Sequence, residues 1–360
     1  MVRYLRILAA VLVSVFALAA CSRAEPSTDQ AAAPAGGQGP AAELRLGYFP
    51  NITHAPALIG VAQGYFAKEL GTTKLITQQF NAGPSEVSAL LGGSLDAAFI
   101  GSSPAINAFA QSHGQTVRLV AGSTSGGAQL VVRPNITTPA QLKGQIIADP
   151  QLGNTQDVSL KKWLKGQQLP IGKGPDAVTV QNLANPRTLD LYKSGGLAGA
   201  WLPEPWSSQL VVEGGATTLV DEKSLWPNGQ FPTTVVLVRT DFLRQHPDTV
   251  AALLRAEVQS IDFINSNLSQ AKTITNTAIK QLTGKTLTQP VLDRAFSELS
   301  FSTDPLSSTY PQLAKDSVTA EITPTVTPLN GFLDVTELNK ILRTAGKPSA
   351  DAGGLDKAQG

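Results

Sequence analysis

Four short segments of this chain place hydroxyl and amide side chains at the start of a helix-like segment, a pattern suited to holding an anion. The first N–H groups of a helix lack partners inside the helix and lie at the positive end of its dipole, so anions are stabilised there. Each segment also contains a small residue or a proline. The four segments are Asn51-Ile52-Thr53-His54, Gly83-Pro84-Ser85, Gly101-Ser102-Ser103-Pro104 and Gly153-Asn154-Thr155-Gln156-Asp157.

Ordinary helix capping is the alternative interpretation for any one of these turns, because Ser, Thr, Asn and Pro are the residues that helix starts prefer. A binding site is favoured only if several turns face one crevice. Each helix end then contributes about 0.3–1 kcal/mol near a surface, and more when it is partly buried. Several ends together could hold a sulfonate or a carboxylate without an arginine.

A second group of candidate residues is the stiff segment Trp201-Leu202-Pro203-Glu204-Pro205-Trp206, which contains two indoles and one carboxylate. Aromatic faces at the mouth of a cleft can cover the alkyl or aryl part of a small solute. Glu204 can accept a hydrogen bond from an amine or a hydroxyl. In the alternative interpretation one tryptophan belongs to the core and Glu204 is a solvated charge in the first turn of a helix. Both interpretations remain open.

The elements that must position these turns alternate between strand and helix. Apolar periodicity predicts strands over 44–49, 74–80, 96–100 and 117–123, and a helix over 55–66. Such alternation predicts an α/β fold with largely parallel sheets and right-handed crossovers. In that fold the ligand crevice lies beyond the carboxyl ends of the strands.

A second lobe is expected to begin near 126–127, with residues 129–132 as a connecting strand and residues 233–239 as the segment that crosses back. Two crossovers would make a hinge. Residues 246–265 show helical apolar spacing, and the chain from there to 344 is expected to be mainly helical. The predicted organisation has lobe 1 over 43–125 and 239–346, lobe 2 over 126–238 and a flexible tail over 347–360.

The N-terminal segment carries Arg3 and Arg6, an apolar stretch over 7–17, and then Leu18-Ala19-Ala20-Cys21. This order is typical of a secretory signal and too short for a spanning helix. Its end resembles the bacterial lipobox, which implies a signal peptide over 1–20 and lipid on Cys21. Residues 22–42, which follow Cys21, are mostly Ala, Pro and Gly. We therefore expect residues 21–42 to be a lipidated, disordered linker.

Composition argues against several classes of function. The chain has 360 residues and a net charge of +1, without the Lys/Arg runs typical of nucleic-acid binding. Cys21 is the only cysteine, and His54, His113 and His246 lack ligand spacing, so we expect neither a disulfide, a metal site nor a cofactor. The sequence contains no Gly-X-Ser-X-Gly, His-Glu-X-X-His or P-loop lysine motif, which argues against an enzyme.

Over about residues 44–345 the chain resembles the solute-binding proteins of ABC importers, most closely the aliphatic sulfonate binders, which are related to taurine, nitrate and thiamine-precursor binders. The resemblance implies a two-lobed, periplasmic-binding-protein-like (type II) fold, each lobe a mostly parallel sheet flanked by helices, with a hinge of two crossover strands. It rests on the segment 47–56, on Gly83-Pro84, on Gly144 with the segment 149–157, and on the segment 201–206.

The resemblance also implies which residues face the cleft between the lobes. The expected ligand-binding residues are Asn51, His54, Gly83, Pro84, Ser85, Ser102, Ser103, Asn154, Thr155, Gln156, Glu204 and Trp206. A buried carboxylate at Glu204 would repel a plain alkanesulfonate, whereas it would suit the ammonium group of a zwitterion such as taurine.

The function implied is capture of a small anionic solute, an aliphatic sulfonate, by closure of the lobes. The protein would act as a monomer and deliver the solute to a membrane permease driven by a cytoplasmic ATPase. It would be held by its lipid at the outer face of the cell membrane, or lie in the periplasm. Taurine, nitrate or a thiamine-precursor pyrimidine is the alternative solute. A secreted enzyme or a surface scaffold lipoprotein is a more remote alternative.

Overall fold

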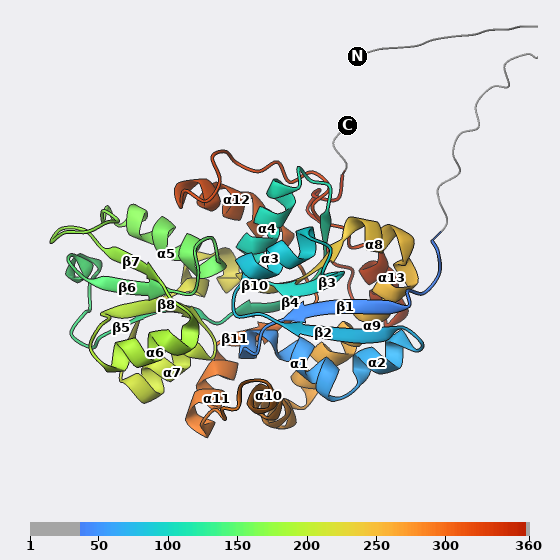
Figure 1. The fold of residues 1–360 in the computed structure, drawn as a ribbon, viewed down its shortest axis with the longest axis horizontal. Coiled ribbons are helices and arrows are strands. Elements are labelled where there is room, and N and C mark those ends of the chain that lie inside the picture. The colour runs from blue at the N-terminus through green and yellow to red at the C-terminus, as the bar shows by residue number, and fades with distance from the viewer. Residues whose placement is uncertain (1–36, 358–360) are drawn as a thin grey trace, which may run out of the picture. The chain divides into compact units, whose positions relative to one another are not determined.

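Two mixed β-sheets flanked by helices form the part of the chain that the computed structural model describes, residues 37–357 (Figure 1). The first sheet contains, in spatial order, β11 (Leu299–Phe301), β4 (Val117–Gly126), β10 (Pro232–Arg239), β3 (Ala97–Ile100), β1 (Glu43–Tyr48) and β2 (Lys74–Gln79). The second contains β7 (Thr179–Asn182), β6 (Ile146–Asp149), β8 (Gly199–Pro203), β5 (Ala128–Val132) and β9 (Thr217–Asp221).

The chain passes between the sheets twice, and these passages define two halves. We call residues 37–126 and 232–357 the six-stranded half and residues 128–221 the five-stranded half. Gly127 is the first connection, and residues 222–231 are the second. The second connection contains the 3-10 helices η3 (Glu222–Leu225) and η4 (Pro227–Gly229).

Each sheet is parallel on one side and antiparallel on the other. β1 pairs in parallel with β2 and β3, and β6 pairs in parallel with β7 and β8. β10 is antiparallel to both β3 and β4, and β5 is antiparallel to both β8 and β9. Three neighbouring strands of each sheet are therefore parallel. The antiparallel pairs involve the strands by which the chain leaves and re-enters each half, β4 with β10 and β5 with β9, which lie side by side in opposite directions.

The helices cover both sheets and follow the predicted alternation with strands. Their bounds are α1 (Ala55–Ala62), α2 (Tyr65–Leu70), α3 (Gly83–Leu91), α4 (Ser102–Gln111), α5 (Thr155–Gly166), α6 (Asn185–Lys193), α7 (Trp206–Gly214), α8 (Thr240–Gln245), α9 (Pro247–Ser266), α10 (Leu268–Thr283), α11 (Gln289–Ser297), α12 (Tyr310–Thr319) and α13 (Thr336–Thr344). The remaining 3-10 helices are η1 (Ile52–His54), η2 (Pro139–Leu142) and η5 (Ser307–Thr309).

Three details differ from the expected elements. The single helix expected over 55–66 is divided into α1 and α2, because Gly64 adopts a left-handed conformation with φ 71° between them. β11 is a short strand within the region expected to be mainly helical. β10 was expected to lie in lobe 2 up to residue 238, whereas it is an inner strand of the six-stranded sheet.

The core is divided between the halves. In the six-stranded half, the buried rings Phe66 and Phe99 meet edge to face, with centroids 6.2 Å apart. In the five-stranded half, Trp201 is fully buried and packs edge to face on Trp163, with centroids 6.1 Å apart. The Trp201 indole N–H donates to Glu222 at 2.9 Å. Trp201 is therefore a core residue, as one of the two sequence interpretations has it.

The described parts of both terminal segments are held against the core. Ala41 N–H donates to Thr249 Oγ1 at 2.8 Å, and Asn339 accepts from Ala350 N–H at 2.7 Å. Ala352 is buried. Ala350 and Ala352 of the expected flexible tail thus contact the folded part of the chain, while most other described residues of that segment are exposed. The flexibility of residues 347–360 stays a prediction. The division into two lobes stays a prediction.

The predicted signal peptide over 1–20, the lipidation of Cys21 and the linker up to residue 36 lie outside the described residues. Among the helices of residues 37–357, none is both long enough and apolar enough to span a bilayer.

Glu257 on α9 provides a test of this core through pH. It is fully buried, its carboxyl oxygens have no hydrogen-bond partner in the described chain, and burial raises its pKa to about 8. The folded chain therefore keeps a proton that the unfolded chain releases near pH 4.5. The stability that Glu257 contributes is complete below that pH and is lost as the pH rises through about 8.

We therefore expect Glu257→Gln to stabilise the protein relative to the wild type at pH 9 but not at pH 5, with a difference on the order of several kcal/mol. Urea unfolding at the two pH values measures this difference. Glu43→Gln, which changes an exposed carboxylate, is the control and should follow the wild type. Equal free energies of unfolding for Glu257→Gln and wild type at both pH values would contradict the prediction.

Candidate functional site

One buried cavity lies where the carboxyl ends of the two sets of parallel strands face each other. Its volume is about 20 Å³. The six-stranded half contributes residues that follow β1, β2 and β3, and the five-stranded half contributes residues at or after the ends of β6, β7 and β8. The lining residues are Phe49, Asn51, Thr53, His54, Asn81, Gly101, Asn154, Thr155, Gln156, Asn185, Pro203 and Thr233.

Three helices begin at this cavity without a side-chain cap. They are α4, α5 and α6. Gly101 precedes α4, Asn154 precedes α5 and Asn185 is the first residue of α6, and all three residues line the cavity. The N–H groups of their first turns thus lack the side-chain acceptor that most helix starts have. Three positive dipole ends from two halves of the molecule are directed toward one small space.

Two side-chain oxygens in the cavity wall also lack partners. Thr155 Oγ1 and Asn185 Oδ1 have no hydrogen-bond partner within the described residues, although both side chains are buried. A buried polar atom without a partner is unfavourable, and such atoms in native proteins usually meet a ligand or an ordered water. The Thr155 hydroxyl is therefore available to a bound molecule.

His54 contributes a neutral ring. Burial lowers the pKa of His54 to about 3, so the imidazole is uncharged at neutral pH. Phe49 N–H donates to His54 Nδ1 at 3.4 Å, and the two rings lie 4.3 Å apart between centroids. This bond assigns the ring proton to Nε2, which makes His54 a further donor.

The cavity wall carries no charged side chain, since no Lys, Arg, Asp or Glu is among its lining residues. Two carboxyls lie behind the start of α5. Asp157 is paired with Lys161 at 2.8 Å. Burial, and next the neighbouring Asp157, raise the pKa of Asp149, which favours its neutral form. The groups that face the cavity are thus neutral side chains and the positive ends of helix dipoles.

The two halves approach closely beside the cavity. A Cβ added at Gly101 would lie 2.4 Å from Thr155 Oγ1. Gly83 N–H donates to Asn154 Oδ1 at 3.4 Å, and Trp206 Nε1–H donates to Asn51 Oδ1 at 3.0 Å. These contacts all join the six-stranded half to the five-stranded half.

The structure brings together some of the predicted site residues. Asn51, His54, Asn154, Thr155 and Gln156 line the cavity. Gly83 and Trp206 lie beside it through their bonds to Asn154 and Asn51.

The other predicted residues do not line the cavity. Ser102 and Ser103 are buried at the start of α4, and within the described residues their hydroxyls have no partner. Pro84 is half-buried, and Ser85 Oγ donates to the carbonyl of Ala82. The Ser85 hydroxyl is thus bonded within its own turn. The ligand-binding role of all these residues stays a prediction.

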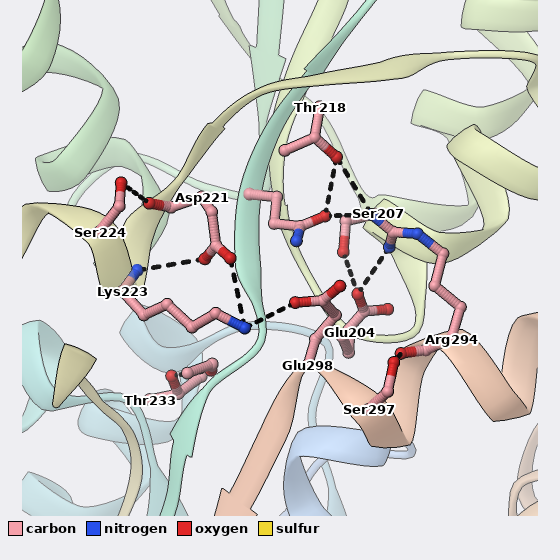
Figure 2. Close-up of polar contacts among 12 residues, drawn as sticks. Glu204, Ser207, Thr218, Asp221, Lys223, Ser224, Thr233, Arg294, Ser297 and Glu298 are labelled. Atoms are coloured by element: carbon pink, nitrogen blue, oxygen red, sulfur yellow. Dashed lines mark hydrogen bonds and ion pairs between the residues drawn. The ribbon is translucent and has the colours of Figure 1, made fainter.

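Glu204 has different surroundings from both of its sequence interpretations. It is fully buried, so it is not a solvated charge, and it does not line the cavity. Its carboxylate accepts from Ser207 Oγ at 2.7 Å and Ser208 N–H at 3.2 Å, and pairs with Arg294 Nη1 at 3.2 Å (Figure 2). Burial raises the pKa of Glu204, and these donors act against that shift. Its counter-charge comes from Arg294 of this chain, and its ligand-binding role stays a prediction.

The expected ligand-binding residues did not include seven residues of the cavity wall: Phe49, Thr53, Asn81, Gly101, Asn185, Pro203 and Thr233. Phe49, Thr53, Gly101 and Pro203 lie in segments singled out from the sequence as turns of a site or as part of the family resemblance, whereas the other three do not. The pair Asn185-Pro186 starts a helix after a strand, in the same pattern as the four turns singled out from the sequence, so this residue could have been found. Thr233 had no local signal. It reaches the cavity because β10 crosses back into the six-stranded sheet at that point.

A family model described as the NMT1-like family matches residues 37–279. The chain belongs to the NMT1-like family. A curated relative is the taurine-binding periplasmic protein of Escherichia coli (strain K12), which is 30% identical over 208 residues, or 57% of this chain and 62% of the relative. The match thus spans less than two thirds of that relative's own length.

Two solved structures of other proteins have the same fold as this chain. The alkanesulfonate-binding protein SsuA of Xanthomonas axonopodis pv. citri, bound to MOPS, has a TM-score of 0.65 at 20% identity, covering 80% of this chain and 96% of that one. The periplasmic nitrate-binding protein NrtA of Synechocystis PCC 6803 has a TM-score of 0.68 at 17% identity, covering 86% and 91%. The predicted periplasmic-binding-protein fold of this NMT1-like chain is confirmed.

The contact at Gly101 predicts how this family member responds to one added methyl group. Gly101→Ala places Cβ 2.4 Å from Thr155 Oγ1, so the Thr155 side chain or the spacing between the two halves must shift. Because both residues are buried, we expect the halves to move apart. We expect a larger radius of gyration in small-angle X-ray scattering. Adding Thr155→Ala should restore the wild-type value, since the Thr155 Cβ lies 3.6 Å from the new methyl.

Gly166→Ala is the matched control for this prediction. Nothing lies within 4 Å of a Cβ added at Gly166, the last residue of α5. This variant should scatter like the wild type. A wild-type radius of gyration for Gly101→Ala would show that the two halves do not approach each other this closely at Gly101 and Thr155.

Proposed function

We propose that this chain is the substrate-binding component of an ABC importer and that it captures an aliphatic sulfonate between its two halves. The observation that carries the proposal is the convergence of the uncapped starts of α4, α5 and α6 on one buried, uncharged cavity. A sulfonate spreads one negative charge over three oxygens. Several N–H and hydroxyl donors at helix ends suit such a group better than one point charge.

The relatives support this class of solute. One is named as a taurine-binding protein, and one solved structure is of an alkanesulfonate-binding protein. Taurine itself fits this chain less well. Its ammonium group calls for a carboxylate, whereas the cavity wall has none and Glu204 is paired with Arg294.

We propose capture by closure of two lobes that correspond to the six-stranded and the five-stranded half. They differ from the predicted lobes chiefly in that β10 belongs to the six-stranded half, and the two connections would act as the hinge. A solute that touches both halves binds the closed arrangement better and shifts the population toward it. The bond between Trp206 and Asn51 would form on closure. The closed form would then dock on a membrane permease driven by an ATPase, and no catalytic step is involved.

The proposed location is the cell envelope. The protein would act as a monomer, with lipid on Cys21 holding it at the outer face of the membrane or with the protein in the periplasm. The relatives named as periplasmic binding proteins support this location.

A small inorganic oxyanion such as nitrate is the second candidate. The specific observation is the cavity volume of about 20 Å³, far below the roughly 300–1,000 Å³ typical of pockets for drug-sized ligands. One solved structure of this fold is of a nitrate-binding protein. An alkanesulfonate would require the halves to close less far than they do here, and nitrate would require little change.

Calorimetry with ethanesulfonate, taurine, nitrate and bicarbonate tests the proposal. We expect ethanesulfonate to bind most tightly. Binding of nitrate alone would replace the sulfonate with the second candidate. If none of the four anions bound, the proposed importer function would be contradicted.

Thr155→Val tests whether the unpartnered hydroxyl in the cavity is a ligand donor. This change keeps the shape of the side chain and removes a hydrogen bond to an anion, which is expected to weaken ethanesulfonate binding by about tenfold or more. At a solute concentration one hundred times the wild-type Kd, the expected stabilisation of the wild type is about 2.7 kcal/mol, and thermal shift should show a smaller stabilisation for Thr155→Val.

Thr275→Val is the matched control, because Thr275 is also buried and its hydroxyl also lacks a partner in the described chain, but it lies in α10 away from the cavity. We expect this variant to bind ethanesulfonate like the wild type. An equal loss of affinity in both variants would assign the effect to general destabilisation.

A further inference from the structure

α11 crosses between the two halves next to the point where the chain first leaves the six-stranded sheet. It precedes β11, which pairs with the last residues of β4. α11 also packs on α7 of the five-stranded half. Figure 2 shows Arg294 of α11 directed toward Glu204 of the five-stranded half, and Glu298, which follows α11, directed toward Lys223 of the second connection.

Arg294 makes all its side-chain bonds to the five-stranded half. Its Nη1 donates to Ser208 Oγ at 2.8 Å and to Glu204 Oε1 at 3.2 Å. Its Nη2 donates to Gln129 Oε1 at 2.5 Å and to Thr218 Oγ1 at 3.1 Å. The four partners come from β5, from β9, from α7 and from the segment between β8 and α7, so one guanidinium contacts four parts of the other half. Figure 2 shows two of the partners, Glu204 and Thr218, beside Arg294.

A second pair lies at the end of the same helix with its charges in the opposite order. Glu298 follows α11 and accepts from Lys223 Nζ at 2.8 Å, and Lys223 is also 3.3 Å from Asp221 (Figure 2). Lys223 belongs to the second connection. α11 thus offers a cation to the five-stranded half and an anion to the connection, which fixes its orientation over both.

The first connection has no free space against the end of α11. A Cβ added at Gly126 would lie 2.8 Å from the carbonyl oxygen of Glu298, and a Cβ added at Gly127 would lie 2.1 Å from Leu299 Cδ2. Both glycines also have positive φ values, 77° and 67°. The turn between the sheets is therefore seated directly on the segment that carries the two ion pairs.

The pair of Arg294 with Glu204 differs from exposed ion pairs between the halves in what separation would cost. Glu204 is fully buried, and removing Arg294 from it would leave a buried, unpaired charge, which is strongly unfavourable. The ion pair of Lys165 with Glu321 is exposed, and such pairs separate at little cost. Opening is thus favoured at contacts like Lys165 with Glu321 and opposed at Arg294.

We propose that α11 is the pivot of the closing motion, and that the contacts of Arg294 and Glu298 persist in both the open and the closed arrangement. This inference rests on the proposed capture by closure. Arg294 is then a positioning residue. It holds Glu204, which accepts from the first turn of α7, and that helix begins with Trp206, whose indole reaches Asn51 beside the cavity.

The experiment measures the distance between the halves in the solute-free protein by pulsed electron paramagnetic resonance. Nitroxides are attached at Ser88→Cys and Ser194→Cys, two exposed positions, one in each half. A Cys21→Ser background leaves these as the only cysteines. The pivot is removed by Glu204→Gln with Arg294→Met, which leaves no buried charge unpaired.

Removal of the pivot should broaden the distance distribution at least twofold, because the axis of motion is no longer fixed. Arg294→Lys with Glu204 intact should recover part of the wild-type width. The matched control, Lys165→Met with Glu321→Gln, removes an exposed pair between the halves and should leave the width unchanged.

Two outcomes would overturn the pivot. A shift of the mean distance to a more open value at unchanged width, with Kd for ethanesulfonate raised tenfold or more, would make Arg294 a latch that opens in every cycle. An unchanged distribution would make it a purely structural contact. If the double variant fails to fold, Lys223→Met with Glu298→Gln tests the same pivot at its more exposed pair.

The distance measurement needs no solute, so it separates this inference from the proposed function. If the protein binds none of the four anions but the distance distribution broadens, the pivot is supported and the importer function is contradicted. If the protein binds ethanesulfonate but the distribution does not broaden, the importer function is supported and the pivot is contradicted.

Discussion

The constraint on which the rest of this structure depends is the double passage of the chain between two sheets. The chain leaves the six-stranded sheet along β4 and returns along β10, and these two strands lie side by side. The parallel strands of the two halves then direct their carboxyl ends toward each other. Every helix that follows such a strand begins in the space between the halves, which is why α4, α5 and α6 share one cavity.

The electrostatic potential in this cavity depends on the positions of the nearby carboxylates and on their partners. Helix dipoles attract an anion only weakly, by about 0.3–1 kcal/mol each near a surface, so one uncompensated carboxylate in the wall would cancel several of them. Glu204 is removed from the cavity by its pair with Arg294. Asp157 is likewise paired with Lys161. The cavity wall is uncharged because no acidic or basic side chain lines it.

Much of the fold could be predicted from the sequence because its signals are local. The alternation of apolar runs and helix-start residues indicates the strands and helices of both halves. The break at Gly64 and the inner position of β10 could not be predicted, since the first depends on one backbone conformation and the second on pairing with strands more than a hundred residues away. Register between distant segments is decided by packing, which no local pattern records.

The candidate site shows the same limit more sharply. Asn154 and Thr155, which line the cavity, could be found because consecutive residues form the pattern that indicates their helix start. The surroundings of Glu204 could not be predicted, because its partner, Arg294, lies ninety residues further along and on another helix. A carboxylate between prolines beside an indole looks the same in sequence whether it meets a ligand or an arginine. Only the position of α11 across the connection decides between the two, so the segment that governs how the halves meet also determines the charge of the site.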